Sequence, residues 1–257
     1  MIVTGVDRAA LEARVKSMYS DVAVNPHGEF HFEMGRSMAE RLGYSPADLD
    51  GIPADAIDSF AGVGHFFHLA DLMPGETVVD LGSGSGMDSF IAAIKVGPTG
   101  HVIGVDMTDA QLSKAERLAV AHKVTNVTYR KAYIEDTGLD GSLCDCVISN
   151  GVINLAADKT RVFSEAARLL KRGGRLAIAD IVTGTPLPEN VVCNADLWAA
   201  CIGGAAQQDN YRAAIENAGF DIIRVEDNAG YHFISERAQK ATAKWGVKSV
   251  SILARRL

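Results

Sequence analysis

A strand that runs into a glycine-rich turn and then into a helix is the feature that most constrains this chain. The segment Val78–Gly86 has the order Val-Val-Asp-Leu-Gly-Ser-Gly-Ser-Gly, and the residues from Asp88 to Lys95 have a helical pattern. Glycines in such a turn allow a ligand to lie against the backbone, outside the carboxyl ends of parallel strands. The motif therefore predicts an open α/β sheet with a ligand site at the end of this strand.

Strand and helix patterns alternate along the rest of the middle of the chain, which indicates βαβ units and a parallel sheet. The expected strands are 77–81, 101–105, 127–131, 144–149, 175–181, 220–225 and 250–254. The expected helices between them are 88–95, 109–122, 159–170 and 211–218, and Gly173 and Gly174 mark the end of the third. We therefore predict a Rossmann-like α/β fold.

The first 70 residues do not alternate in this way. Amphipathic helix patterns cover Arg8–Tyr19 and Glu33–Leu42, and Ser45-Pro46 is typical of a helix start. Residues 182–207 form a long connection, and connections of this length are usually functional or disordered. We expect an N-terminal helical cap over residues 1–70, one compact domain over residues 71–257, and an insertion after the fifth strand.

Composition and charge exclude several classes of protein. The chain has 257 residues, 47% of them hydrophobic, which suits a packed core. Its 25 Lys and Arg against 32 Asp and Glu lack the basic footprint of a nucleic-acid binder. It has no apolar run long enough to span a membrane, and Asp7 and Arg8 lie where a signal peptide would be apolar. We expect a cytoplasmic protein that binds neither nucleic acid nor membrane.

The four cysteines are Cys144, Cys146, Cys193 and Cys201. No Cys-x-x-Cys pair is present, which argues against a zinc ribbon, and no recognised metal-binding signature occurs elsewhere. A cysteine in a reducing compartment is usually a thiol that behaves as a small buried hydrophobe. Because Cys144 and Cys146 are two residues apart in a predicted strand, both are expected on one face of the sheet.

Carboxylates near the glycine-rich turn indicate which ligand binds there. The nicotinamide fingerprint G-x-G-x-x-G fails, because Met87 occupies its last glycine position. Asp80 precedes the turn and suits an ammonium group, whereas a pyrophosphate would be repelled by it. Asp106 ends the next strand, 20 residues after Gly86, at the spacing of an acid that binds ribose hydroxyls. An amino acid moiety joined to a ribose fits S-adenosylmethionine better than a dinucleotide.

Two further segments follow successive strands. Within Tyr133–Asp136, Ile134 is expected to cover the adenine face, and Glu135 to lie at the adenine edge. Asn150, at the end of the fourth strand, is expected near the methyl group. The alternative is that these carboxylates only cap loops.

With these motifs the chain resembles class I S-adenosylmethionine-dependent methyltransferases, and within them the arsenite methyltransferase family. The segments that carry the resemblance are 80–86, 100–108, 147–155 and 197–205. The resemblance implies a seven-stranded sheet with a reversed last hairpin, S-adenosylhomocysteine as product, and a tyrosine, Tyr19, that closes over the cofactor. The expected cofactor-binding residues are Tyr19, Asp80, Gly82, Ser83, Gly84, Gly86, Asp106, Met107, Ile134, Glu135 and Asn150.

The chain departs from the family at two positions. The family holds trivalent arsenic with three cysteine thiolates, one in a Gly-Cys-Gly where this chain has Val63, and one after Ser-Asn where it has Gly151. The third is kept as Cys201. Trivalent arsenic needs soft thiolates, and one thiolate cannot chelate it. Cys146 and Cys193 are the remaining substitutes to consider, and Cys146 lies in a predicted central strand. We therefore expect an acceptor other than arsenite.

Histidines and aromatic residues surround the first lost cysteine. His31 and His65 are candidate bases, because a histidine of near-neutral pKa can deprotonate a nucleophile; core packing is the alternative for each. The expected catalytic residues are His31, His65, Asn150 and Cys201. The expected acceptor is a small molecule, first a soft nucleophile (thiol, sulfide, selenide or organoarsenical). An O- or N-methyltransferase with a histidine base and a catalytically silent S-adenosylmethionine-binding module are alternatives, and a homodimer is a further expectation.

Overall fold

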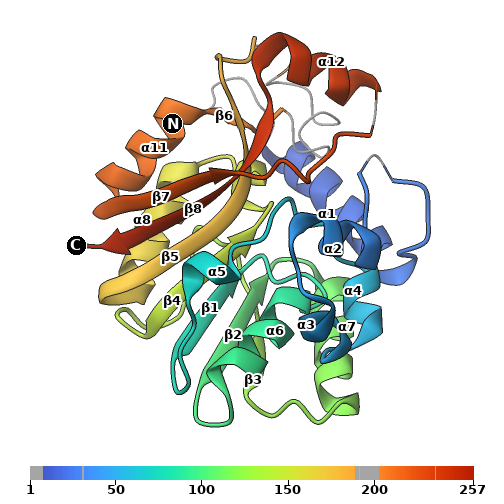
Figure 1. Cartoon of the computed structure of the whole chain (residues 1–257), viewed down its shortest axis with the longest axis vertical. Coiled ribbons are helices and arrows are strands. Elements are labelled where there is room, and N and C mark those ends of the chain that lie inside the picture. The colour runs from blue at the N-terminus through green and yellow to red at the C-terminus, as the bar shows by residue number, and fades with distance from the viewer. Residues whose placement is uncertain (1–7, 31, 189–190, 192–202, 235) are drawn as a thin grey trace.

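A single mixed sheet forms the centre of the molecule (Figure 1). The computed structural model describes residues 8–30, 32–188, 191, 203–234 and 236–257, so the predictions for His31, Cys193 and Cys201 lie outside the described residues. The strands are β1 (Thr77–Leu81), β2 (His101–Asp106), β3 (Val127–Lys131), β4 (Cys144–Asn150), β5 (Leu170–Thr183), β6 (Ala206–Gln207), β7 (Phe220–Asp227) and β8 (Lys248–Arg256).

The strand order is β3-β2-β1-β4-β5-β8-β7, and the short β6 pairs with β5 off this path. Strands β1 to β5 pair in parallel, whereas β8 is antiparallel to both of its neighbours. The predicted Rossmann-like sheet with a reversed last hairpin is therefore confirmed. The order changes direction between β1 and β4, and a ligand binds at the carboxyl ends of the strands beside such a switch point.

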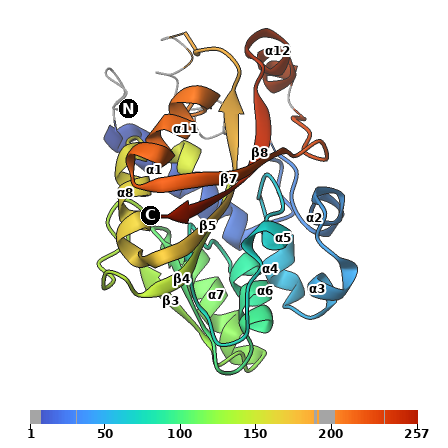
Figure 2. The same cartoon turned by 60° about the vertical axis from the view of Figure 1, so that its left-hand side comes forward.

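Helices cover both faces of the sheet (Figure 2). Helices α2 (Arg36–Leu42), α3 (Pro46–Asp50), α4 (Ala54–Asp58), α5 (Phe67–Ala70), α6 (Met87–Val96) and α7 (Asp109–Ala121) pack in one apolar cluster. Helices α8 (Lys159–Leu169) and α11 (Gln208–Asn217) and the 3₁₀ helix η1 (Ile153–Leu155) pack in the cluster on the opposite face. Helix α1 (Arg8–Val24) packs against α7, and α12 (Glu236–Trp245) lies between β7 and β8 in the chain.

Local sequence signals placed some element ends correctly and others not. Helix α3 begins at Pro46, and its N-cap Ser45 accepts a hydrogen bond from the Asp48 backbone N–H, as predicted. Gly173 and Gly174 do not end a helix. Helix α8 ends at Leu169, and β5 begins at Leu170 because that residue already pairs with Cys144 of β4. No helix among the described residues is long and apolar enough to cross a membrane.

The two described cysteines lie on opposite faces of the sheet, so the prediction of a shared face was wrong. A shift in the pairing of β4 with β5 falls between Cys144 and Cys146 and breaks the alternation of side chains. Cys144 packs in the cluster of α8, and Cys146 packs in the cluster of α6. Both are fully buried, and burial raises the pKa of each thiol, which makes them small core residues.

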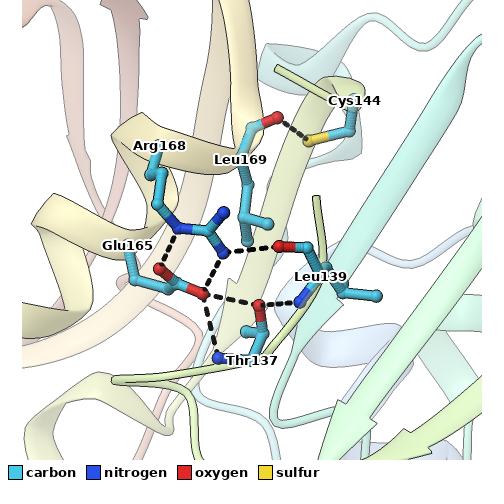
Figure 3. Close-up of polar contacts among 6 residues, drawn as sticks. All are labelled: Thr137, Leu139, Cys144, Glu165, Arg168 and Leu169. Atoms are coloured by element: carbon cyan, nitrogen blue, oxygen red, sulfur yellow. Dashed lines mark hydrogen bonds and ion pairs between the residues drawn. The ribbon is translucent and has the colours of Figure 1, made fainter. Parts of the chain in front are cut away.

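A polar tether fixes the segment that leads from β3 to β4 (Figure 3). Glu165 of α8 accepts hydrogen bonds from the Thr137 backbone N–H at 2.9 Å and the Thr137 hydroxyl at 2.5 Å. Arg168 donates to Glu165 and to the Leu139 carbonyl, in each case at 2.7 to 2.8 Å. Burial alone would raise the pKa of Glu165, but these hydrogen bonds outweigh it and lower the pKa to about 2. The segment is therefore held to α8 at several points.

Candidate functional site

A cavity of about 420 Å³ opens at the carboxyl ends of β1, β2 and β4. Its walls come from these strand ends, the glycine-rich turn, helix α1, and the segments that follow β3 and β4. Among the predicted site residues, those that line it are Tyr19, Asp80, Gly82, Ser83, Gly84, Asp106, Met107, Ile134, Glu135 and Asn150. Gly86 and His65 are not among the lining residues.

The glycine-rich turn needs glycine for two reasons. Gly82 and Gly84 have φ angles of 77° and 51°, in the left-handed region that disfavours a side chain. A Cβ on Gly82 would also lie 2.3 Å from Val152, in the segment after β4. Gly86, at the start of α6, would bring a Cβ within 2.3 Å of the Tyr129 hydroxyl. Gly86 thus permits close packing of α6 on β3 rather than lining the cavity.

Asp106 joins the turn to the end of β2. Its carboxylate accepts hydrogen bonds from the Gly84 backbone N–H at 3.0 Å and the Thr108 backbone N–H at 2.8 Å. The Thr108 side chain and the Met107 backbone also interact with this carboxylate, which lines the cavity. Burial raises the pKa of Asp106, and the backbone hydrogen bonds oppose this shift. Asp106 therefore organises the turn and lies in the cavity wall.

Asp80 lies below the turn and is only 2% exposed. The Ser89 hydroxyl donates to it at 2.6 Å. Burial, with a smaller contribution from the neighbouring Asp88, raises the pKa of Asp80 to about 8. A cation bound at this point would stabilise the ionised carboxylate, so Asp80 suits an ammonium group of a ligand.

Asn150 ties the end of β4 to the segment that precedes β1. Its amide oxygen accepts from the backbone N–H groups of Val63 and Gly64 at 2.8 and 3.3 Å. Its amide nitrogen donates to the Gly64 carbonyl at 2.9 Å, to the Tyr44 hydroxyl at 3.0 Å and to Asp88 at 3.1 Å. These bonds place Asn150 as a positioning residue in the cavity wall.

Comparisons with known proteins agree with this geometry. A family model described as a methyltransferase domain matches residues 72–219. The arsenite methyltransferase of Halobacterium salinarum is 42% identical over 193 residues, which cover 75% of this chain and 49% of that protein. The crystal structure of CrArsM, an arsenic(III) S-adenosylmethionine methyltransferase from Chlamydomonas reinhardtii, is 30% identical with a TM-score of 0.64, and the match covers 87% of this chain and 74% of that chain.

The chain belongs to the arsenite methyltransferase-like family of class I S-adenosylmethionine-dependent methyltransferases. It spans about half the length of the curated arsenite methyltransferases that it matches. Geranyl diphosphate methyltransferase has a TM-score of 0.66 at 18% identity, with coverage of 96% of this chain and all of that one, which shows a shared fold.

The polar groups of the cavity fit the cofactor that defines this family. The Asp106 carboxylate suits ribose hydroxyls, and the Asp80 carboxylate suits the ammonium group. Ile134, 8% exposed, offers an apolar surface to the adenine, with Glu135 beside it. The Ser83 hydroxyl is buried and has no hydrogen-bond partner among the described residues, so a polar ligand group would satisfy it.

Helix α1 covers the cavity and is fixed by polar contacts that the sequence did not reveal. Gln111 of α7 donates to the Tyr19 backbone carbonyl at 2.8 Å and accepts from the Ser85 hydroxyl. Lys16 donates to Glu12 at 2.6 Å and to the Tyr133 hydroxyl at 3.0 Å, next to Ile134 in the chain. Leu11, Glu12, Val15, Gln111 and Asp88 all line the cavity and were not predicted as site residues.

His65 lies behind the cavity wall. Its ring meets Tyr44 edge-on at 4.7 Å between centroids, and its Nδ1 lies 3.2 Å from Nδ1 of His68. Burial, with the neighbouring His68, lowers the pKa of His65 to about 4, which keeps the imidazole neutral. His68 extends the pair outward, with its Nε2 2.7 Å from Glu226. The structure therefore places His65 in contact with Tyr44 rather than with the cavity.

Proposed function

We propose that the chain binds S-adenosylmethionine in this cavity and transfers its methyl group to a small acceptor that is a soft nucleophile other than arsenite. Thiols, sulfide, selenides and organoarsenicals are the candidate acceptors. The family membership and the fit of Asp80, Asp106, Ile134 and Ser83 support the cofactor. S-adenosylhomocysteine would be the second product.

The contact between Val63 and Gly151 carries the acceptor part of this proposal. These are the two positions where the family places arsenic-binding thiolates. Val63 is 1% exposed, and a Cβ on Gly151 would lie 3.1 Å from its Cγ1. An isopropyl group therefore fills the space between the two positions, and no thiolate is present at either.

The two described cysteines offer no replacement for the missing thiolates. Cys144 and Cys146 are fully buried in separate clusters, and burial raises the pKa of each thiol. A thiolate is the form that binds a soft metalloid, and a buried thiol of raised pKa does not supply one at neutral pH. Among the described residues, no pair of thiolates could chelate trivalent arsenic.

A turnover assay with methyl-labelled S-adenosylmethionine tests the proposal. The acceptor panel contains an alkanethiol, sulfide, dimethyl selenide, a trivalent monomethylarsenical and arsenite, and S-adenosylhomocysteine is quantified for each. We expect turnover with at least one soft acceptor and none above background with arsenite.

Two outcomes would overturn parts of the proposal. Arsenite turnover as fast as that of the best soft acceptor would remove the acceptor assignment. Tight cofactor binding without turnover of any acceptor would favour a catalytically silent binding module. Asp106→Ala serves as the matched control, because it removes the acceptor sites for ribose and should weaken cofactor binding without touching Val63 or Gly151.

A further inference from the structure

Asp88 is a buried carboxylate in the cavity wall to which the proposed cofactor site assigns no role. It lies in the first turn of α6, two residues after Gly86, and is 6% exposed. It lines the cavity together with Gly62 and Asn150. Gly62 precedes Val63 and Asn150 precedes Gly151, the two positions where the resemblance places the family's arsenic-binding thiolates. We therefore assign this end of the cavity to the acceptor.

Two hydrogen bonds orient the Asp88 carboxylate. The Tyr44 hydroxyl donates to its Oδ1 at 2.6 Å, and the Asn150 amide donates to its Oδ2 at 3.1 Å. Since a carboxylate oxygen has about two acceptor lone pairs, each oxygen retains one. Tyr44 is itself 2% exposed and is packed against Phe60 and His65, so the group that orients Asp88 is fixed.

We propose that Asp88 is the general base that takes the proton from the methyl acceptor, an inference that rests on the proposed function. The proton of an S–H or Se–H acceptor passes to the Asp88 carboxylate as the acceptor's electron pair forms the bond to the methyl carbon. The bond between that carbon and the cofactor's sulfur breaks, and its electron pair stays on the sulfur. This step is needed only for soft nucleophiles that carry an ionisable proton.

The electrostatics around Asp88 suit this role. Burial raises the pKa of Asp88 to about 6, and the hydrogen bonds from Tyr44 and Asn150 limit the shift. The titratable groups that face it are Tyr44 and Asp80, and the pKa of Asp80 is raised further, to about 8. At neutral pH Asp88 is therefore the ionised member of the pair. A base whose pKa lies near the working pH is effective in proton transfer.

Acceptors with and without a proton separate a base from a structural residue. The full chain is assayed with an alkanethiol, which must lose a proton, and with dimethyl selenide, which has none to lose. General-base catalysis contributes about 100-fold or more. We expect Asp88→Asn to lower alkanethiol turnover by about 100-fold more than dimethyl selenide turnover.

The pH profile is the second measurement. With the alkanethiol, wild-type kcat should fall as the pH drops through the Asp88 pKa, and Asp88→Asn should lack this acid limb. Tyr44→Phe should move the limb to higher pH, because the lost hydrogen bond had lowered the pKa of Asp88. Asp180→Asn is the matched control, since Asp180 is a buried carboxylate, 1% exposed, that does not line the cavity. Asp180→Asn should change the turnover of both acceptors by the same factor.

Two results for Asp88→Asn would overturn the role of Asp88 as general base: an equal loss of turnover with both acceptors, or an acid limb that persists. Either result would leave the methyltransferase proposal intact. If the wild type turns over the alkanethiol alone, the pH profiles decide. If the wild type turns over neither acceptor, both proposals fail for these substrates. Calorimetry of S-adenosylmethionine binding then shows whether the protein is folded, because a misfolded protein would not bind the cofactor.

Discussion

The two ends of the cavity are built in different ways. At the end that we propose for the cofactor, Asp80 and Asp106 lie at the ends of neighbouring strands, and Gly82 and Gly84 lie in the turn between them. The bond from Gly84 to Asp106 spans 22 positions of the chain. At the end that we propose for the acceptor, Asn150 reaches Val63 and Gly64 across 86 to 87 positions. The cofactor end follows from local strand–turn–helix geometry, whereas the acceptor end depends on how the N-terminal segment packs on the sheet. Removal of one side chain at the acceptor end should therefore lower the free energy of unfolding more than removal of one at the cofactor end.

The largest effect is expected for Asn150→Ala. The change removes the hydrogen bonds of Asn150 to the backbone of Val63 and Gly64, and Asp88 and Tyr44 keep only the bond that joins them to each other. Losing these buried hydrogen bonds should cost about 3 kcal/mol together. Urea unfolding measures the loss. Asn126→Ala is the control, because Asn126 donates two bonds of 2.9 Å to Ala93 and Gly97. A loss for Asn150→Ala no greater than for this control would contradict the contrast between the ends.

At the cofactor end, Gly82→Ala should destabilise the fold by about 2 kcal/mol, from the left-handed φ and the contact with Val152. Gly84→Ala shares the positive φ, but the nearest atom to its Cβ would be Gln111 Oε1 at 3.7 Å. It should cost about 1 kcal/mol. Thermal unfolding of both variants checks the difference, and equal costs would show that Val152 moves aside.

Asp106→Ala should weaken S-adenosylmethionine binding by about 1–3 kcal/mol, because ligand hydroxyls and the Gly84 N–H lose their acceptor. Isothermal titration calorimetry gives the change in Kd. Asp109→Ala is the matched control, since Asp109 is an exposed carboxylate nearby that forms an ion pair with Lys131 at 2.7 Å. An unchanged Kd for Asp106→Ala would remove the ribose assignment.

The pH dependence of binding should reveal Asp80. Its pKa of about 8 means that the carboxyl is mostly protonated in the free protein at pH 7, and an ammonium group requires the ionised form. Affinity should therefore rise with pH between 6 and 8, by at most about tenfold per pH unit, and level off above the Asp80 pKa. Calorimetry across this range tests the slope. Asp80→Asn should bind weakly at every pH, and a slope that survives in this variant would assign it to another group.

Most of the fold and of the cofactor end could be predicted from the sequence, because alternating strands, a glycine-rich turn and the acid at each strand end are local signals. The roles of Asn150 and Asp88 could not, since their partners Val63 and Tyr44 are distant in the chain. His65 was predicted as a base from its residue type, but residue type does not show whether the imidazole faces the cavity. The shift beside Cys146 likewise depends on how β4 pairs with β5.

The tether between Glu165, Arg168 and Thr137 has a consequence for the affinity of the neighbouring site. It fixes the segment that follows Ile134 and Glu135, so little conformational entropy remains to be lost there when a ligand binds. The end of the cavity that we propose for the cofactor is in this sense preorganised by Glu165 and Arg168, which do not themselves line the cavity. Weakening the tether should lower the affinity for the ligand, even though every side chain that lines the cavity is unchanged.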